Sequence, residues 1–198
     1  SPSDHFYLCE NLYPLQSARG EEGDITDLLK YPDRKERFSL SDENNLASKE
    51  EIYLTCQTKE DSGQPGLVLN FRQTMMTTYF IYSALGYMGD EVGDIFAMLE
   101  TRKISNSKLK NGIKKELGQV EIYTWNETNN RWEYQHGFYE TGPIAINRQF
   151  IPLHNIRSGS KVRIKIVLNK GLWRMDYAAL TNIRQEVTPL ELTPTAVL

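Results

Sequence analysis

Apolar and polar residues alternate along two parts of the chain, before residue 73 and after residue 118. In KVRIKIVL (residues 161–168), every second side chain is aliphatic, and those between them are mostly basic. Such alternation predicts a half-buried antiparallel strand, because successive side chains of a strand point to opposite faces. Strand-like runs bounded by turn residues also cover residues 5–15, 51–56, 66–73, 119–125, 131–140, 143–153 and 172–180. The pattern predicts a mainly β fold, an antiparallel β-sandwich.

The hydrophobic period changes between these two parts. Residues 77–88 (TTYFIYSALGYM) are apolar without alternation. Behind Asp90, a suitable N-cap, residues Val92, Ile95, Phe96 and Leu99 follow a helical spacing. We expect two helices broken near Gly89, within a helical insertion of about residues 76–115, in one sandwich domain covering residues 1–198.

Charge is unevenly distributed along a chain whose net charge is only −3. Residues 1–64 hold fourteen acidic and seven basic side chains, whereas residues 102–174 hold five acidic and fourteen basic ones. This asymmetry fits either a nucleic-acid surface or two segments that neutralise each other within one fold. The overall pI near 5.7 favours the second explanation. The basic run 102–115 contains no aromatic residue, which favours a solvated loop over a nucleic-acid channel.

Two cysteines, Cys9 and Cys56, allow at most one disulfide, and their separation fits neither a redox CxxC motif nor a zinc site. Two buried thiols are favoured over a bridge, which leaves the cellular compartment open. No apolar run approaches the roughly 20 residues needed to span a bilayer.

The last strand-like run, LWRMDYAAL, places two opposite charges on an otherwise apolar face. Strict alternation puts Arg174 and Asp176 beside Leu172, Ala178 and Leu180. Because a buried charge needs a partner, we predict a structural ion pair between Arg174 and Asp176.

The same strand also carries a family resemblance. WRMDYAAL (residues 173–180), with Met175, Asp176 and Tyr177 at its centre, resembles the final strand of galactose-binding-like jelly rolls, the fold of many carbohydrate-binding modules. Residues 24–29, 72–90 and 140–146 resemble an uncharacterised module of bacterial cell-envelope proteins, some of which carry FG-GAP or ASPIC-type repeats. The resemblance implies a jelly-roll sandwich at an extracytoplasmic location (periplasmic, cell-surface or secreted), with no established activity.

In the resembled fold the Asp of this strand often helps to hold a structural calcium ion with a carboxylate near the N-terminus. Here that carboxylate would belong to Glu10 or Asp4. Calcium takes six to eight oxygen ligands, and Asp176 and Glu10 together supply only a few of them. The sequence therefore favours the ion pair between Arg174 and Asp176 over a calcium site at Asp176 and Glu10. No other cofactor is expected.

The main candidate for ligand binding is a hairpin over residues 119–138. If NETNN (residues 126–130) forms its turn, Trp125 faces Trp132, Tyr123 faces Tyr134 and Glu121 faces His136. Four aromatic rings in two cross-strand ranks would form a flat platform for sugar rings, with Glu121 and His136 available to sugar hydroxyls. The alternative is that this face is the sandwich core. The alternative gains support because Val120 and Ile122 compete weakly for burial against two Trp residues.

Motifs of enzymes are scarce. The chain has no GxSxG, HExxH, P-loop or dinucleotide-binding sequence, and His5, His136 and His154 are scattered. We therefore expect a non-catalytic binding module of an envelope or secreted protein, with carbohydrate as the first ligand class. The alternative is a structural or protein-interaction domain of a larger envelope protein, with the helices between Tyr79 and Leu99 as its contact surface. Neither the ligand nor the oligomeric state follows from the sequence.

Overall fold

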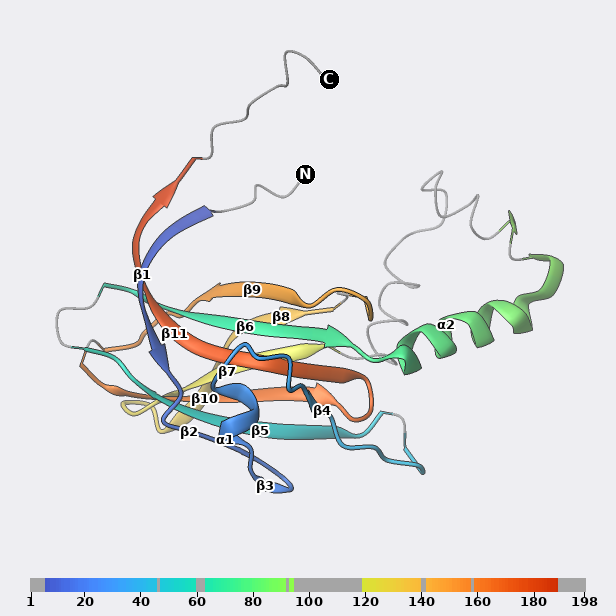
Figure 1. Cartoon of the computed structure of the whole chain (residues 1–198), viewed down its shortest axis with the longest axis horizontal. Coiled ribbons are helices and arrows are strands. Elements are labelled where there is room, and N and C mark those ends of the chain that lie inside the picture. Colours follow the sequence, from blue (N-terminus) through green and yellow to red (C-terminus); the bar gives the residue numbers. More distant parts are fainter. Residues whose placement is uncertain are drawn as a thin grey trace, which may run out of the picture.

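A computed structural model of the chain describes residues 6–45, 47–59, 63–91, 93–94, 119–139, 142–157 and 159–188. Their strands form two antiparallel sheets stacked as a sandwich (Figure 1). Sheet A contains β1 (Phe6–Pro14), β4 (Arg37–Phe38), β6 (Pro65–Gln73), β9 (Asn147–Pro152) and β11 (Trp173–Val187). Sheet B contains β2 (Ser17–Gly20), β3 (Gly23–Asp24), β5 (Lys49–Gln57), β7 (Val120–Asn126), β8 (Arg131–Phe138) and β10 (Lys161–Asn169).

The order of the strands is that of a jelly roll. Sheet A runs β1-β11-β6-β9, with β4 paired to the start of β11, and sheet B runs β3-β2-β5-β10-β7-β8. If the short β2, β3 and β4 are set aside, successive strands alternate between the sheets except at the β7–β8 hairpin, as in a double Greek key. The predicted antiparallel β-sandwich is confirmed.

The core lies between the sheets and follows the alternation in the sequence. The aliphatic side chains at alternate positions of β10, from Val162 to Leu168, are buried, as are Leu67, Leu69 and Phe71 of β6. The ring of Phe71 lies 5.8 Å from that of Trp173 and 5.2 Å from that of Phe138, measured between centroids. The expected inward positions of these strands are therefore confirmed.

A buried arginine ties the two sheets together at one edge. Arg37 of β4 is 3% exposed, and its guanidinium donates to Glu50 of β5 at 2.7 and 2.8 Å and to Glu22 at 2.8 and 3.0 Å. Burial works against the charged arginine, but the two carboxylates raise its pKa above the ordinary value. The short helix α1 (Thr26–Leu29) lies nearby and packs against β11 and β2.

Ion pairs join the acidic N-terminal segment to the basic C-terminal segment. Lys165 lies 3.1 Å from Glu51, and Lys170 lies 2.7 Å from Glu21. These contacts support mutual neutralisation within the fold as the reason for the uneven charge.

Helix α2 (Met75–Met88) follows β6 and projects from one end of the sandwich (Figure 1). It ends at Gly89, whose φ of 57° is a left-handed value that favours glycine, and a 3-10 turn, η1 (Gly89–Glu91), follows. The first predicted helix is confirmed. The second one, from Val92 to Leu99, and the basic run 102–115 lie largely or wholly outside the described residues, and the extent of the domain stays a prediction. No helix in the described ranges combines the length and the hydropathy that a membrane span requires.

Candidate functional site

A β-bulge in β11 changes which side chains share a face. Met175 pairs with Phe71 and Tyr177 pairs with Asn70, so Asp176 is an extra residue between them. The bulge shifts the alternation by one position, and the core side chains of β11 are therefore Trp173, Met175, Ala178 and Leu180.

The bulge also separates the two charged residues of this strand. The carboxylate of Asp176 is 2% exposed and accepts a hydrogen bond from the Asn70 amide at 3.5 Å. The guanidinium of Arg174 lies 3.6 Å from Glu36 and 4.4 Å from the ring centroid of Phe38. The predicted ion pair between Arg174 and Asp176 is therefore wrong, because Asp176 contacts Asn70 and Arg174 contacts Glu36 instead.

The register of β1 against β11 bears on the expected calcium site. Glu10 lies opposite Asn182, six residues along β11 from Asp176, which is about 20 Å at the rise of a strand. The carboxylate of Glu10 pairs instead with Arg184. Asp176 and Glu10 are thus too far apart to share one ion, and Asp4 lies outside the described residues. The described part of the chain holds no group of three or more His, Cys, Asp or Glu side chains that could bind a metal.

Both cysteines are free thiols, Cys56 buried and Cys9 partly buried. Burial raises the pKa of Cys56 to about 12, so it remains protonated and unreactive.

The predicted hairpin is present as β7 and β8. The side-chain oxygen of Asn126 accepts hydrogen bonds from the backbone N–H groups of Thr128 and Asn129 at 2.8 and 3.0 Å. This local bonding forms the turn, and Asn130 completes it with a φ of 49°, a conformation that Asn adopts more readily than most residues. Trp125 consequently pairs with Trp132, and Tyr123 with Tyr134, as the turn predicts.

The aromatic side of the hairpin faces away from the core. Val120, Ile122 and Thr124 of β7 are buried against the opposite sheet, while Tyr123 and Trp125 point outward. The alternative in which the Trp residues form the core is therefore wrong. The small β-branched residues fit the layer that Ile164 and Ile166 of β10 already fill.

The rings of the hairpin are tilted rather than coplanar. The ring centroids of Trp125 and Trp132 are 5.4 Å apart at 71°, and those of Tyr123 and Tyr134 are 5.6 Å apart at 73°. Edge-to-face packing of this kind is favourable between aromatic rings. The expected flat platform is therefore a ridged surface.

A second bulge removes His136 from this surface. Ile122 pairs with His136 and Tyr123 with Tyr134, so Gln135 is the extra residue, and Glu121 lies opposite Gly137. The His136 ring lies 4.7 Å from that of Phe138, whose own ring packs against the core. The predicted pairing of Glu121 with His136 is wrong. The partial burial of His136 lowers its pKa, so it is neutral at pH 7.

Side chains from two other strands complete the surface. The ring centroid of Tyr53 in β5 lies 5.8 Å from that of Trp132. The ammonium of Lys165 in β10 lies 5.2 Å from the Tyr123 ring centroid and 5.5 Å from that of Trp132. We call the aromatic face the outer surface of sheet B formed by Tyr53, Tyr123, Trp125, Trp132 and Tyr134. The sequence missed Tyr53 and Lys165 because only the strand order brings β5 and β10 beside the hairpin.

Carboxylates border the aromatic face and are held charged. The hydroxyl of Tyr123 donates to Glu121 at 2.5 Å, and the ammonium of Lys49 lies 2.9 Å from the same carboxylate. Burial alone would raise the pKa of Glu121, but these two donors lower it below its ordinary value. Burial and the hydrogen bond to Glu121 raise the pKa of Tyr123 to about 12, so its hydroxyl remains a donor.

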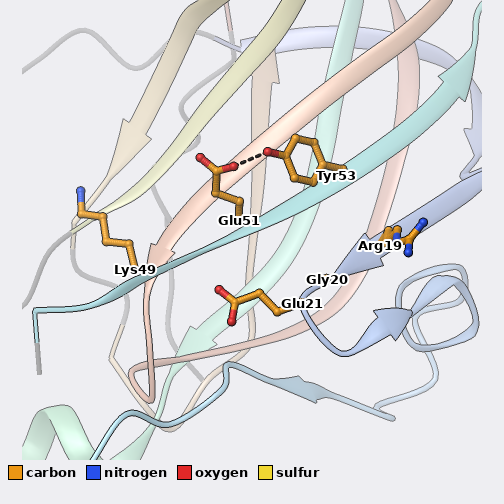
Figure 2. A pocket seen from close by; sticks show the side chains of 6 residues that line it. All are labelled: Arg19, Gly20, Glu21, Lys49, Glu51 and Tyr53. Carbon is orange, nitrogen blue, oxygen red and sulfur yellow. Dashed lines mark hydrogen bonds between the residues drawn. The ribbon is translucent and has the colours of Figure 1, made fainter. Parts of the chain in front are cut away.

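A hollow of about 480 Å³ adjoins the aromatic face on the same side of sheet B. Its lining residues are Arg19, Gly20, Glu21, Lys49, Glu51 and Tyr53. Figure 2 shows Glu51 and Tyr53 side by side on β5, joined by a hydrogen bond in which the tyrosine hydroxyl donates. The hollow and the aromatic face therefore share Tyr53 and form one continuous surface.

Comparisons with known proteins give little beyond these observations. No family model matches the chain, and no curated protein matches it. One similar solved structure is that of TmCBM61 in complex with beta-1,4-galactotriose, with a TM-score of 0.34 and 10% sequence identity. The alignment covers 69% of this chain and 66% of that chain, just under two thirds of its length. A likeness this low does not show what this chain binds.

Proposed function

We propose that the chain is a non-catalytic carbohydrate-binding module acting outside the cytoplasm, and that the aromatic face is its binding surface. The observation that carries the proposal is the outward position of this face. Tyr134 is 57% exposed and Tyr53 is 42% exposed, beside the partly exposed Trp132. An exposed cluster of large rings on a folded domain indicates a binding partner.

The chemistry of the aromatic face suits a sugar. A pyranose ring presents C–H groups on its faces and hydroxyls at its edge. Aromatic rings pack against the C–H groups, while Glu121, Lys49 and Lys165 supply acceptors and donors for the hydroxyls. The extracytoplasmic location rests on the resemblance to envelope modules and is part of the proposal.

The proposal is tested by calorimetry with a panel of cell-wall and plant polysaccharides. For any polysaccharide that binds, Trp132→Ala and Tyr134→Ala should weaken binding at least about tenfold, since a lost ring contact of this kind costs about 1.4 kcal/mol or more. Tyr31→Ala is the matched control, because Tyr31 is 56% exposed in the loop after α1, outside the strands β5, β7 and β8 that form this surface. Equal losses for Tyr31→Ala and Tyr134→Ala, or no binding across the panel, would contradict the proposal.

A second candidate function, protein interaction, is favoured by helix α2. The helix has no charged residue in its 14 positions. Its large exposed side chains are Met75, Met76, Tyr79, Tyr82, Tyr87 and Met88. An apolar helix surface of this size is ordinarily covered, and a second copy of the chain could cover it without any like-charge repulsion between the two helices.

Light scattering at increasing protein concentration tests this second function. We expect a dimer that Tyr82→Glu converts to a monomer, because the new carboxylate would lose its hydration in the interface. Tyr31→Glu adds the same charge elsewhere and should leave the dimer intact. A wild-type chain that stays monomeric at high concentration would contradict it.

A further inference from the structure

The hollow beside the aromatic face contains one charged side chain, Arg19, whose hydrogen-bond donors are unused among the described residues. Arg19 points outward from β2, since its neighbour Ala18 is buried, and it lies directly opposite Tyr53 of β5. Its guanidinium makes no hydrogen bond, ion pair or ring contact with any of the described residues. Asp24 lies opposite Arg19 on β3, but its carboxylate accepts its hydrogen bonds from the hydroxyl and the backbone N–H of Thr26, at 2.6 and 2.9 Å. These hydrogen bonds lower the pKa of Asp24, and the positive charge of Arg19 makes a smaller contribution in the same direction.

The other charges of the hollow are already engaged. Glu51 accepts from the Tyr53 hydroxyl and from Lys165, the latter at 3.1 Å. Glu21 lies 2.7 Å from Lys170, and Lys49 lies 2.9 Å from Glu121. The hollow therefore offers a ligand the unused donors of one guanidinium, while its carboxylates are occupied.

Guanidinium chemistry selects the ligand group. Arginine has five N–H donors and no acceptor, arranged as a planar fork that matches a carboxylate with two parallel hydrogen bonds. A neutral sugar hydroxyl can use only one of these donors at a time. A carboxylate of an acidic sugar uses two and also neutralises the charge.

Arg19 also lies in line with the aromatic face. Direct cross-strand pairing links Arg19 to Tyr53, Tyr53 to Lys165, Lys165 to Tyr123, and Tyr123 to Tyr134. These five side chains form one rank across β2, β5, β10, β7 and β8, about 19 Å long at the usual spacing of strands. A surface of this length accommodates several consecutive sugar residues.

We propose that the ligand is an acidic polysaccharide that lies across the strands, with a uronate carboxylate held by Arg19 in the hollow and neutral ring faces packed on the aromatic face. This inference rests on the proposed carbohydrate-binding function and adds the class of polysaccharide. Lys165 lies at the middle of the rank, but its charge is paired with Glu51, so Arg19 is the group that selects an anionic chain.

Polygalacturonate and its fully methyl-esterified form are suitable probes, since they share a backbone and differ in charge. The whole chain should bind polygalacturonate at least about tenfold more tightly than the ester, because a hydrogen-bonded charge pair is worth that much or more. Arg19→Gln should remove most of this difference, because it weakens binding of polygalacturonate far more than binding of the ester. Raising the salt concentration should weaken binding of polygalacturonate only.

Arg184→Gln is the control, since it removes the same charge from an exposed position on sheet A. Equal affinity for the two polymers, or an equal loss with Arg184→Gln, would overturn the acidic-sugar inference and leave the proposed function standing. If binding of polygalacturonate responds to Trp132→Ala but not to Arg19→Gln, the conclusion is the same. Absence of binding to every polysaccharide would overturn both proposals.

Discussion

The two faces of sheet B differ in the kind of side chain that the same strands place on them. Its inner face presents aliphatic side chains such as Ile122, Ile164 and Ile166, which are completely buried. Its outer face presents the largest side chains of these strands, Trp125 and Trp132, with charged groups between them. The guanidinium of Arg163, for example, lies 4.5 Å from the ring centroid of Trp125.

The difference shows that side-chain size does not decide which face of a strand is buried. A layer about 10 Å thick between two sheets is filled well by branched aliphatic residues. A Trp or Tyr ring carries a polar atom and attracts cations to its face, so it is also stable at a surface with charged neighbours. Large rings next to Lys, Arg and Glu therefore indicate an outer surface in this sheet.

The assignment of the inner and outer faces of sheet B is tested most directly by truncating one residue on each face of β7. Ile122→Ala should lower the free energy of unfolding by about 2–5 kcal/mol, because it leaves a cavity in the core. Trp125→Ala removes many more atoms but should cost only about 1 kcal/mol, an ordinary value for a substitution outside the core. Chemical denaturation measures both, and a larger loss for Trp125→Ala would contradict the assignment of the faces.

Much of this fold follows from local patterns in the sequence. The alternation in β10 predicts its buried face residue by residue, and the turn at Asn126 predicts the pairing of Trp125 with Trp132. Both features depend on side chains that are close in sequence, and patterns of hydrophobicity and turn residues record them directly.

The two bulges mark where local patterns fail. One extra residue at Asp176 and one at Gln135 invert the alternation from that point on. The predictions for Arg174 with Asp176, and for Glu121 with His136, fail for this single reason. A bulge is stabilised by contacts from other elements: the side chain of Gln135 bonds to Thr124 and to the backbone of His154, which alternation cannot reveal.

The candidate site was predictable only within the hairpin. Tyr123, Trp125, Trp132, Tyr134 and Glu121 do share a surface, because one turn sets their pairing. Tyr53, Lys165 and Arg19 join them from strands that are neighbours in space but distant in the chain. Their place in the site depends on the jelly-roll strand order, which no local pattern contains.

The smallest expected effect is a dependence of stability on acidic pH. It should come from the outer face of β7, because titratable groups occur on that face and not on the inner one. The pKa of Glu121 is lowered in the folded chain, so its charged form stabilises the fold above the ordinary value of 4.5, and this contribution is lost as the pH falls below it. Glu121→Gln should cost about 1 kcal/mol or less at pH 7, as expected for a partly exposed pair with Lys49. The difference in stability between the two proteins should shrink as the pH falls below 4.5, which thermal unfolding between pH 7 and pH 3 measures. A difference in stability that stays constant down to pH 3 would contradict a stabilising role for the charge of the Glu121 carboxylate.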